Sequence, residues 1–380
     1  MTMDDSRFKI PPKLTAVSVI LLGIGIVSAI SGFASDPVRI WGNVLICNYY
    51  FICLVIGATF FAAIQRITQA GWSAMFERIP GAISGYMPFA AVLTLLMVFF
   101  GTHSIYHWSP HKAWYLNFPF FSLRAVIFLG AWQFFMRLQR KFSVNEDKVG
   151  GLQNFKKAEF YSRVYIFVLA PTFSLASFDW IMSIDSHWFS TIFAIINFVS
   201  AFLHGSAAII LITLILHKMG YFPQLNSAHL HDFSKYLFML SIMWVYVWFS
   251  QYFLIWYGNI PEETIYYVSR TSREWNATFL ANVIINWCFP FLFLMNNRVA
   301  GNINALIVTS VVLLVGMWLD IYMQVMPGLT GKNSFGMIEL GMFLGFLGIF
   351  IFAVTRSLSK ANIIPANHPY LNESFLHKAH

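Results

Sequence analysis

The sequence has little charge and almost no cysteine. Only 11% of its 380 residues are Asp, Glu, Lys or Arg, whereas 58% are hydrophobic. A soluble domain carries roughly a quarter charged residues, so this chain could not cover a water-facing surface of its size. Runs of about 20 apolar residues, each long enough to cross a bilayer, recur from end to end. The composition therefore predicts an all-α integral membrane protein and excludes a soluble globular one.

Patterns that bind redox cofactors are also missing. Cys47, Cys53 and Cys288 lie singly in apolar segments and lack the spacing of an iron–sulfur site, so we interpret them as small core residues. No glycine-rich nucleotide loop follows a strand. A membrane b-type haem needs two axial ligands at matching depth, but His204 and His217 share one predicted helix. We therefore expect this chain to bind no metal or redox cofactor.

Hydropathy predicts about ten membrane spans, each built on about 20 apolar residues. Nothing divides them into separate units, so residues 1–380 are expected to form one polytopic membrane domain with polar tails at 1–13 and 358–380. The predicted spans lie near residues 14–33, 41–67, 81–101, 119–138, 160–181, 188–217, 232–257, 274–296, 301–323 and 335–357.

Basic residues are divided unequally between the two sides of this predicted bundle. The side with both termini holds about 18 of the 24 Lys and Arg, and the other side holds about six. The positive-inside rule then places both termini in the cytoplasm. The loop at 137–157 contributes most, and we interpret it as a topology determinant rather than a ligand patch. The net charge of +8 thus has a topological explanation, and no nucleic-acid partner is expected.

One apolar segment, FSTIFAIINFVSAFLH at 189–204, carries a regular polar stripe. Ser190, Asn197, Ser200 and His204 are seven, three and four residues apart, which places them on one face of a helix. The preceding residues 183–187 form a short polar hinge. A polar stripe is unfavourable in hydrocarbon, so it is expected to face protein or water.

Neighbouring spans carry further polar side chains at helical spacing. Buried His, Tyr, Asn and Gln can hold ordered water and pass protons. The alternative is structural, because such side chains also hydrogen-bond between helices, at about 0.6 kcal/mol each. Likewise, Asp185 could instead cap the next helix, and Asp179 and Asp320 could reach water near helix ends. The candidates for a proton path are Asp179, Ser183, Asp185, His187, Asn197, Ser200, His204, Tyr246, Ser250, Gln251, Asn282, Asn286 and Asp320.

Two loops on the side away from the termini are rich in Trp and Tyr. They are THSIYHWSPHKAWY at 102–115 and WYGNIPEETIYYVSRTSREW at 256–275. Such loops suit an interfacial aromatic belt or a docking surface for another subunit. In the second loop, acidic and basic residues are expected to pair locally, with contact to a partner as the alternative. The candidates for partner contact are His103, His107, Trp108, Glu262, Glu263, Arg270 and Arg273.

Two long, aromatic-rich stretches resemble a known family. SFDWIMSIDSHWFSTIF at 177–193 and HDFSKYLFMLSIMWVYVWFSQYFLIWYGNIPEETIYY at 231–267 are similar to the quinol:cytochrome c oxidoreductase membrane subunits of bacterial alternative complex III. Those subunits belong to the wider polysulfide-reductase, or NrfD-like, membrane family. With about ten spans and no long extension, the chain resembles the compact ActF-type subunit more than its larger ActC-type sibling.

The resemblance implies two four-helix bundles with peripheral helices, in the bacterial inner membrane. The complex would oxidise menaquinol at the outer side and pass electrons to a soluble cytochrome c or a terminal oxidase. Its iron–sulfur clusters and c-type haems would be held by other subunits: an iron–sulfur protein and c-type cytochromes, next to a sibling NrfD-like subunit.

The subunit resembled here would scaffold the complex and offer a proton path. One alternative is that this chain itself binds and oxidises quinol at its outer cluster of His, Tyr and acidic residues. Another is a stand-alone carrier, for which inverted repeats with broken helices would be expected, and no clear repeat is visible in the sequence. No quinol-site motif can be transferred to particular residues.

Overall fold

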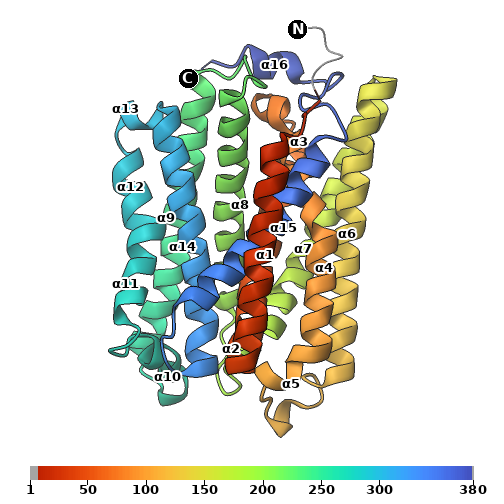
Figure 1. The fold of residues 1–380 in the computed structure, drawn as a ribbon. Coiled ribbons are helices and arrows are strands. Elements are labelled where there is room, and N and C mark those ends of the chain that lie inside the picture. The colour runs from red at the N-terminus through yellow and green to blue at the C-terminus, as the bar shows by residue number, and fades with distance from the viewer. Residues whose placement is uncertain (1–6, 379–380) are drawn as a thin grey trace.

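The computed structural model describes residues 7–378 and is a bundle of long helices that run up and down (Figure 1). Within those residues, ten helical segments are long and apolar enough to cross a membrane, which confirms the predicted all-α membrane fold. No strand forms in this part of the chain, where Arg7 and Asn362 make an isolated antiparallel bridge. We refer to the side with this bridge as the termini face and to the other side as the opposite face.

The predicted spans all appear, several of them longer than expected because helices project beyond the apolar core. The first two spans are α1 (Pro12–Ser35) and α2 (Pro37–Ile67). The third span is broken into six short helices: η2 (Gly71–Phe76), α3 (Arg78–Ile83), η3 (Ser84–Tyr86), α4 (Met87–Leu96), η4 (Met97–Gly101) and α5 (Thr102–Ile105). The fourth span is α6 (Phe118–Val149), and the fifth is α7 (Leu152–Trp180) with η6 (Met182–Ile184). The last five are α8 (Ile192–Lys218), α9 (Ser227–Gly258), a second broken span of α11 (Asn276–Val283), η7 (Ile284–Cys288) and α12 (Phe289–Leu294), then α14 (Ile303–Thr330) and α15 (Met337–Leu358). The short helices η5 (Pro110–Lys112), α10 (Pro261–Arg270), α13 (Asn297–Ala300) and α16 (Leu371–Phe375) lie between or after them.

Eight spans form two consecutive four-helix bundles. In bundle I, α2 packs on α4 and α7, and α6 closes the ring between them. In bundle II, α8 packs on α9 and α14, and the broken span α11–η7–α12 closes the ring on the far side. The remaining spans, α1 and α15, pack mainly on each other and cover α2 from outside. This arrangement matches the two-bundle architecture that the resemblance implies.

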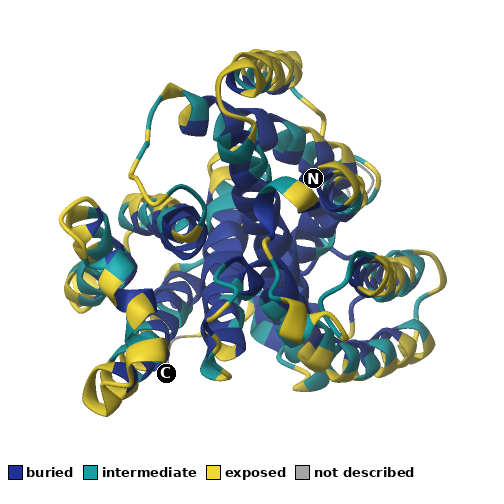
Figure 2. Cartoon of the chain, turned by 90° about the horizontal axis from the view of Figure 1, so that it is seen from below, coloured by how far each residue is buried: buried dark blue, intermediate teal, exposed yellow. Residues whose placement is uncertain are grey.

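Helix α2 is the central element of the molecule. Every residue from Leu45 to Thr59 is buried, and the buried centre is visible when the bundle is viewed along its axis (Figure 2). Helix α2 crosses α8 closely, where Gly57 faces Ala201 and Gly205. A β-carbon on Gly57 would overlap the Ala201 carbonyl, so the two bundles approach this closely because small residues line the crossing.

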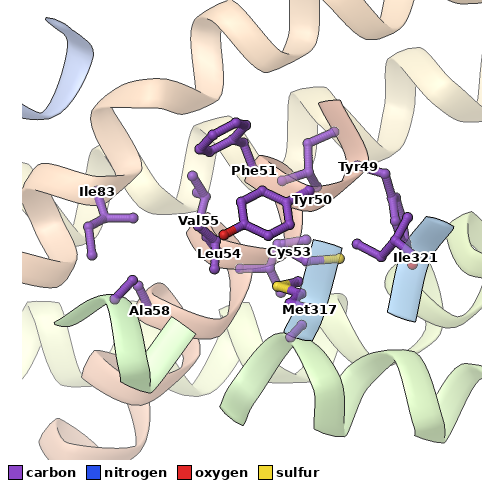
Figure 3. Packing of buried hydrophobic residues seen from close by; sticks show 14 of the residues in the cluster. Tyr49, Tyr50, Phe51, Cys53, Leu54, Val55, Ala58, Ile83, Met317 and Ile321 are labelled. Atoms are coloured by element: carbon purple, nitrogen blue, oxygen red, sulfur yellow. The ribbon is translucent and has the colours of Figure 1, made fainter. Parts of the chain in front are cut away.

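Aromatic side chains fill the contact between α2 and its neighbours. Tyr49 and Tyr50 lie on the side of α2 that faces Met317 and Ile321 of α14 (Figure 3), whereas the Phe51 ring packs against Phe343 and Phe350 of α15. The Tyr50 hydroxyl donates to the Leu314 carbonyl at 3.1 Å, so its polar end is satisfied inside the bundle. This packing holds bundle II against the central helix.

The C-terminal segment, expected to be a polar tail, folds back onto the termini face. Ile363 is buried, Ser374 Oγ donates to the Trp72 carbonyl at 2.8 Å, and His377 Nε2 lies 2.6 Å from Asp232 Oδ2. The described part of this segment therefore closes the end of the bundles.

Candidate functional site

A closed ring of hydrogen bonds lies inside bundle II. Ser200 Oγ lies 3.2 Å from Asp320 Oδ2, and Asn282 Nδ2 donates to Asp320 Oδ1 at 3.0 Å. Asn286 Nδ2 donates to Asn282 Oδ1 at 2.7 Å, and its own Oδ1 lies 3.0 Å from His204 Nε2. His204 Nδ1 returns to Ser200, 2.6 Å from its carbonyl oxygen. All five residues are buried, so three helical spans are joined by one polar network.

Helical spacing explains how the ring forms. Ser200 and His204 are four residues apart on α8, and Asn282 and Asn286 are four apart on the broken span, so each pair faces inward together. Asn286 lies in the π-helical segment η7, a kind of distortion that is frequent at functional sites. Gly316 of α14 leaves room for it, because a β-carbon there would overlap the Asn286 amide.

The partners of Asn286 indicate where the protons of His204 lie. Asn286 Nδ2 faces the Asn282 carbonyl and the Gly316 carbonyl, each at 3.1 Å, besides Asn282 Oδ1. These acceptors assign the orientation of the amide, so its Oδ1 must accept from His204 Nε2. Because Nδ1 faces the Ser200 carbonyl, each ring nitrogen has an acceptor beside it.

Ser200 connects the two titratable members of the ring. Its Oγ lies 3.2 Å from Asp320 Oδ2 and 3.3 Å from His204 Nδ1. A hydroxyl both donates and accepts, so Ser200 can donate to either neighbour. This geometry allows a proton to pass between the imidazole and the carboxylate through one side chain.

Two further predicted residues are buried inside the protein. Asn197, one turn before Ser200, accepts from the Tyr49 hydroxyl of α2 at 3.1 Å. The sequence did not predict Tyr49 as its partner. Gln251 accepts from the Tyr267 hydroxyl at 3.0 Å, which links α9 to α10. Both are buried, as expected for members of an interior polar stripe. Ser190, by contrast, lies before α8 begins at Ile192 and is not part of the helical face.

The hinge residue Asp185 does not cap α8. The cap position is Thr191, without a side-chain hydrogen bond, whereas Asp185 Oδ2 accepts from Arg270 at 2.8 Å. Arg270 is buried, and its Nε donates at 2.9 Å to the Met323 carbonyl. That carbonyl has no amide partner in its own helix because Pro327, four residues on, lacks the N–H. Asp185 and Arg270 therefore cap the kinked end of α14.

The prediction that acidic and basic residues within the loop at 256–275 pair with each other is wrong. Arg270 pairs with Asp185 from another loop and stacks on Tyr266, 3.4 Å from the ring centroid. Glu262 and Arg273 are exposed and Glu263 is half-buried, and no ion pair forms between these acids and the loop arginines within residues 7–378. Arg270, being buried, is not available for contact with a partner.

Asp179 belongs to bundle I and has a different environment. Its Oδ2 accepts from Arg124 Nε at 2.6 Å, and it is buried rather than in contact with water. Ser183 Oγ donates to the Asp179 carbonyl at 2.6 Å and receives the Trp108 indole N–H at 3.3 Å. Trp108 is thus partly committed to internal packing, although it was predicted as a partner contact.

A pocket of about 370 Å³ opens beside this pair on the opposite face. Aromatic and aliphatic side chains make up most of its wall, including Trp114, Leu175 and Trp188. Asp179 Oδ1 and the Trp188 indole nitrogen are buried without a protein partner. A mostly apolar cavity with a few polar groups is the usual form of a small-molecule site.

Several predicted residues lie away from these sites. Tyr246 is 71% exposed on the outer side of α9, and the Ser250 hydroxyl donates back to the Tyr246 carbonyl. The polar face of α9 turned inward is the other one, which carries Gln251. His103 and His107, which stay predicted partner contacts, and His187, which stays a predicted proton-path residue, are exposed on the opposite face.

The termini face holds a buried group of charges that the sequence prediction missed. Glu77 is paired with Arg66 and lies 3.1 Å from His368 Nε2. Arg78 donates to Asp147 at 2.8 Å. These residues come from four separate segments of the chain. The signal in the sequence that could have indicated this group is that each charged residue lies close to a long apolar run.

The geometry of the described residues indicates no metal site, and the comparisons with known proteins indicate no family. Within residues 7–378, no three His, Cys, Asp or Glu side chains lie close enough together to hold a metal ion. No protein-family model matches the chain, and no curated protein matches its sequence significantly.

Proposed function

We propose that this chain is a membrane subunit of a respiratory quinol:electron-acceptor oxidoreductase, which scaffolds its partners and conducts protons through bundle II. The resemblance at 177–193 and 231–267 supports the type of complex. Its partners would be a sibling NrfD-like subunit, an iron–sulfur protein and c-type cytochromes, with menaquinol as the substrate of the complex. Both termini would lie in the cytoplasm, as the excess of basic residues on the termini face favours.

The hydrogen-bonded ring is the observation that carries the proton path. A histidine and a carboxylate inside a membrane bundle are unfavourable unless they are paired, and such groups commonly mark proton relays. In this ring Ser200 would accept a proton from His204 Nδ1 while donating its own to Asp320 Oδ2. The Ser200 hydroxyl then carries the proton that came from the imidazole, and its rotation back toward Asp320 resets the relay once Asp320 has passed its proton on and His204 has taken up another.

The ring would connect to the opposite face through the kinked end of α14. Gln324 lies one turn beyond Asp320, and its carbonyl accepts from Arg270 at 2.8 Å. Arg270 in turn holds Asp185, whose side chain is 22% exposed. Polar groups thus follow one another from water to the ring.

Toward the termini face the polar groups are fewer. Ser206 and Ser310 are buried and their hydroxyls have no protein partner, and Thr213 bonds only to its own helix. Buried hydroxyls of this kind ordinarily bind ordered water. We infer that this half of the path conducts through water rather than through a chain of side chains.

The test uses the assembled complex with His204→Gln and, separately, Asp320→Asn. Both variants keep hydrogen-bonding groups of similar size but remove the titratable group. We expect the number of protons released per quinol oxidised to fall, while complex assembly is unchanged. Tyr246→Phe, on the exposed face of α9, is the matched control. An unchanged proton ratio in both variants, with intact assembly, would eliminate the proton path.

Membership of the complex is tested separately. The tagged chain is purified in mild detergent, and the co-purifying proteins are stained for covalently bound haem. A scaffold subunit should bring down c-type cytochromes and an iron–sulfur protein. Stable transport activity of the chain alone would instead favour a carrier.

The pocket beside Asp179 favours a second function, the binding of quinol by this chain. Its volume and apolar wall suit a ring with an isoprenoid tail, and the free Asp179 Oδ1 could accept a quinol hydroxyl. Leu175→Trp would fill the pocket without removing the ion pair, and Ile127→Trp on the exposed side of α6 is its control.

A photoreactive quinone analogue provides the readout for this second function. If the pocket binds quinol, the analogue labels this chain, Leu175→Trp abolishes labelling, and Ile127→Trp leaves it unchanged. Equal labelling of all three proteins would contradict a site here.

A further inference from the structure

A groove of about 620 Å³ lies on the termini face between α4, α6 and α15. Ser84 and Gly85 of η3 also line it, next to Pro88 and Phe89 of α4. Five cationic side chains line it and no acidic one does: Arg137, Arg140 and Lys141 from α6, with Arg356 and Lys360 from the end of α15. We propose that this groove binds the phosphate headgroup of an anionic phospholipid.

Most of these charges are not used inside the protein. Arg137, Lys141, Arg356 and Lys360 form no ion pair with an acid in the described part of the chain. They contrast with the buried arginines nearby, such as Arg66 and Arg78, each of which holds a carboxylate. A concave surface with several unpaired cations and no anion is complementary to a phosphate.

One cation of the groove is held in a fixed position. Arg140 donates to the Gly81 carbonyl at 2.9 Å and to the Ser357 carbonyl at 2.6 Å, and it also bonds to the Ser357 hydroxyl. It therefore joins α3, α6 and α15 at the base of the groove. A charge that is already ordered loses little further conformational entropy when it meets an anion.

The depth of the groove matches the position of lipid phosphates. Arg137 lies 19 residues after Phe118, where α6 begins at the opposite face, and Arg356 lies 19 residues after Met337, where α15 begins. At 1.5 Å per residue each distance is about 29 Å, close to the thickness of the hydrocarbon core, about 30 Å. Two helices thus independently place their cations at one membrane interface.

Apolar side chains beside the groove can receive the acyl chains. Phe89 is 39% exposed and Phe352 is 37% exposed, and their rings meet edge to face with centroids 6.4 Å apart. Val92 and Leu96 continue the exposed apolar surface along α4 toward the middle of the bilayer. A free phosphate ion would use only the cations, whereas a phospholipid would use both surfaces, so the groove favours the lipid.

The experiment compares lipid retention by the full chain and by a triple variant, Arg137→Gln/Lys141→Gln/Arg356→Gln. The protein is reconstituted in nanodiscs with equal phosphatidylglycerol and phosphatidylcholine, extracted in mild detergent, and analysed by native mass spectrometry. Each basic residue near an anionic headgroup strengthens binding by about fivefold. We therefore expect phosphatidylglycerol to be retained at least about tenfold over phosphatidylcholine, and the triple variant to lose this preference.

A matched control separates the groove from general surface charge. Lys148→Gln/Lys156→Gln/Arg298→Gln removes the same charge from exposed positions on the termini face outside the groove. It should retain the lipid preference. Loss of preference in the control, or equal retention of the two lipids by the wild type, would overturn the proposal.

The source of the phosphate is tested in the wild-type protein, so that the result does not depend on folding of a variant. Inorganic phosphate at 10 mM, roughly the scale at which weak anion sites fill, should leave the bound lipid in place. Displacement of phosphatidylglycerol by inorganic phosphate would show a soluble-anion site and overturn the assignment to lipid. Likewise, lipid retention that does not change between 0.05 and 1 M salt, a range over which charge screening becomes strong, would contradict a charged headgroup site.

Discussion

Bundles I and II share one architecture but have opposite interiors. The middle of bundle I is aromatic, with Trp132 against Phe173, and its charges lie near the two ends as ion pairs. The middle of bundle II contains the ring of His204, Ser200, Asp320 and two asparagines. Bundle I therefore uses its polar groups to fix helix ends, and bundle II places titratable groups where a proton path would need them.

The difference lies in how each carboxylate is satisfied. Asp179 is bound to a guanidinium that also donates to the Tyr115 carbonyl at 3.0 Å and stacks over the Tyr115 ring. Asp320 is surrounded by neutral donors, Asn282 and Ser200, with no ion pair in the described residues. A carboxylate held by an arginine is committed to that partner, whereas one held by a hydroxyl can exchange a proton.

The largest effect is expected from breaking the ion pair of bundle I. Arg124→Met would leave the Asp179 carboxylate buried without its cation, which typically costs about 3–5 kcal/mol in the free energy of unfolding. The measurement is unfolding in detergent micelles. Arg273→Met, at an exposed position, should change stability little. Adding Asp179→Leu to Arg124→Met should restore most of the loss, and failure to do so would mean that the pair is not the cause.

A smaller loss is expected from opening the ring of bundle II. Asn286→Leu would remove partners from His204 Nε2, Asn282 Oδ1 and the Gly316 carbonyl, and unsatisfied buried polar groups cost about 1–3 kcal/mol each. We expect a total loss of about 2–3 kcal/mol, since some groups will find other partners. Asn276→Leu, exposed on the same span, is the control. Stability equal to that of the control would show that the ring does not form.

The contact between the bundles should respond to a single methyl group. Gly57→Ala would force α2 and α8 apart, because the added carbon overlaps the Ala201 carbonyl, at a cost of about 1–3 kcal/mol. Gly130→Ala, in open space on α6, should instead stabilise the helix by about 0.5–1 kcal/mol. Thermal unfolding of the two variants distinguishes the effects by their opposite signs. A Gly57→Ala protein as stable as wild type would contradict the close crossing.

The smallest effect is expected on the exposed face of α9. Tyr246→Phe and Ser250→Ala change groups that make no contact with the ring, so stability should stay within about 0.5 kcal/mol of the wild type. The proton ratio of the complex should also be unchanged. A marked fall in that ratio would indicate that protons pass along the outer face of bundle II instead.

Local spacing was enough to identify most of the ring. Ser200 with His204, and Asn282 with Asn286, are pairs four residues apart in otherwise apolar segments, which a sequence reader can recognise. Spacing could not decide between the two polar faces of α9, because both have helical periodicity and only packing determines which one turns inward. It also could not reveal Tyr49 as the partner of Asn197, since the two are far apart in the chain.

The errors near helix ends have a common physical cause. Asp185 was a reasonable cap for the helix that follows it, and Arg270 a reasonable partner for Glu262 or Glu263, if only neighbours in sequence are considered. In the folded chain Pro327 leaves the Met323 carbonyl of α14 without an amide partner. Arg270 donates to this carbonyl and also to Asp185. The unpaired carbonyl, which is distant in the chain, therefore determined the partners of Arg270 and Asp185, and the pairings predicted from sequence neighbours did not form.

The sequence alone predicted a membrane bundle of about ten spans, because the hydrocarbon core of a bilayer requires long apolar helices and such runs can be recognised without a structure. It also determined which buried segments carry polar groups. The tertiary structure alone decided that the spans divide into two bundles and that five of those polar groups close into one ring. Helical periodicity places a side chain on a face, but only the packing of that face against another helix gives it a partner.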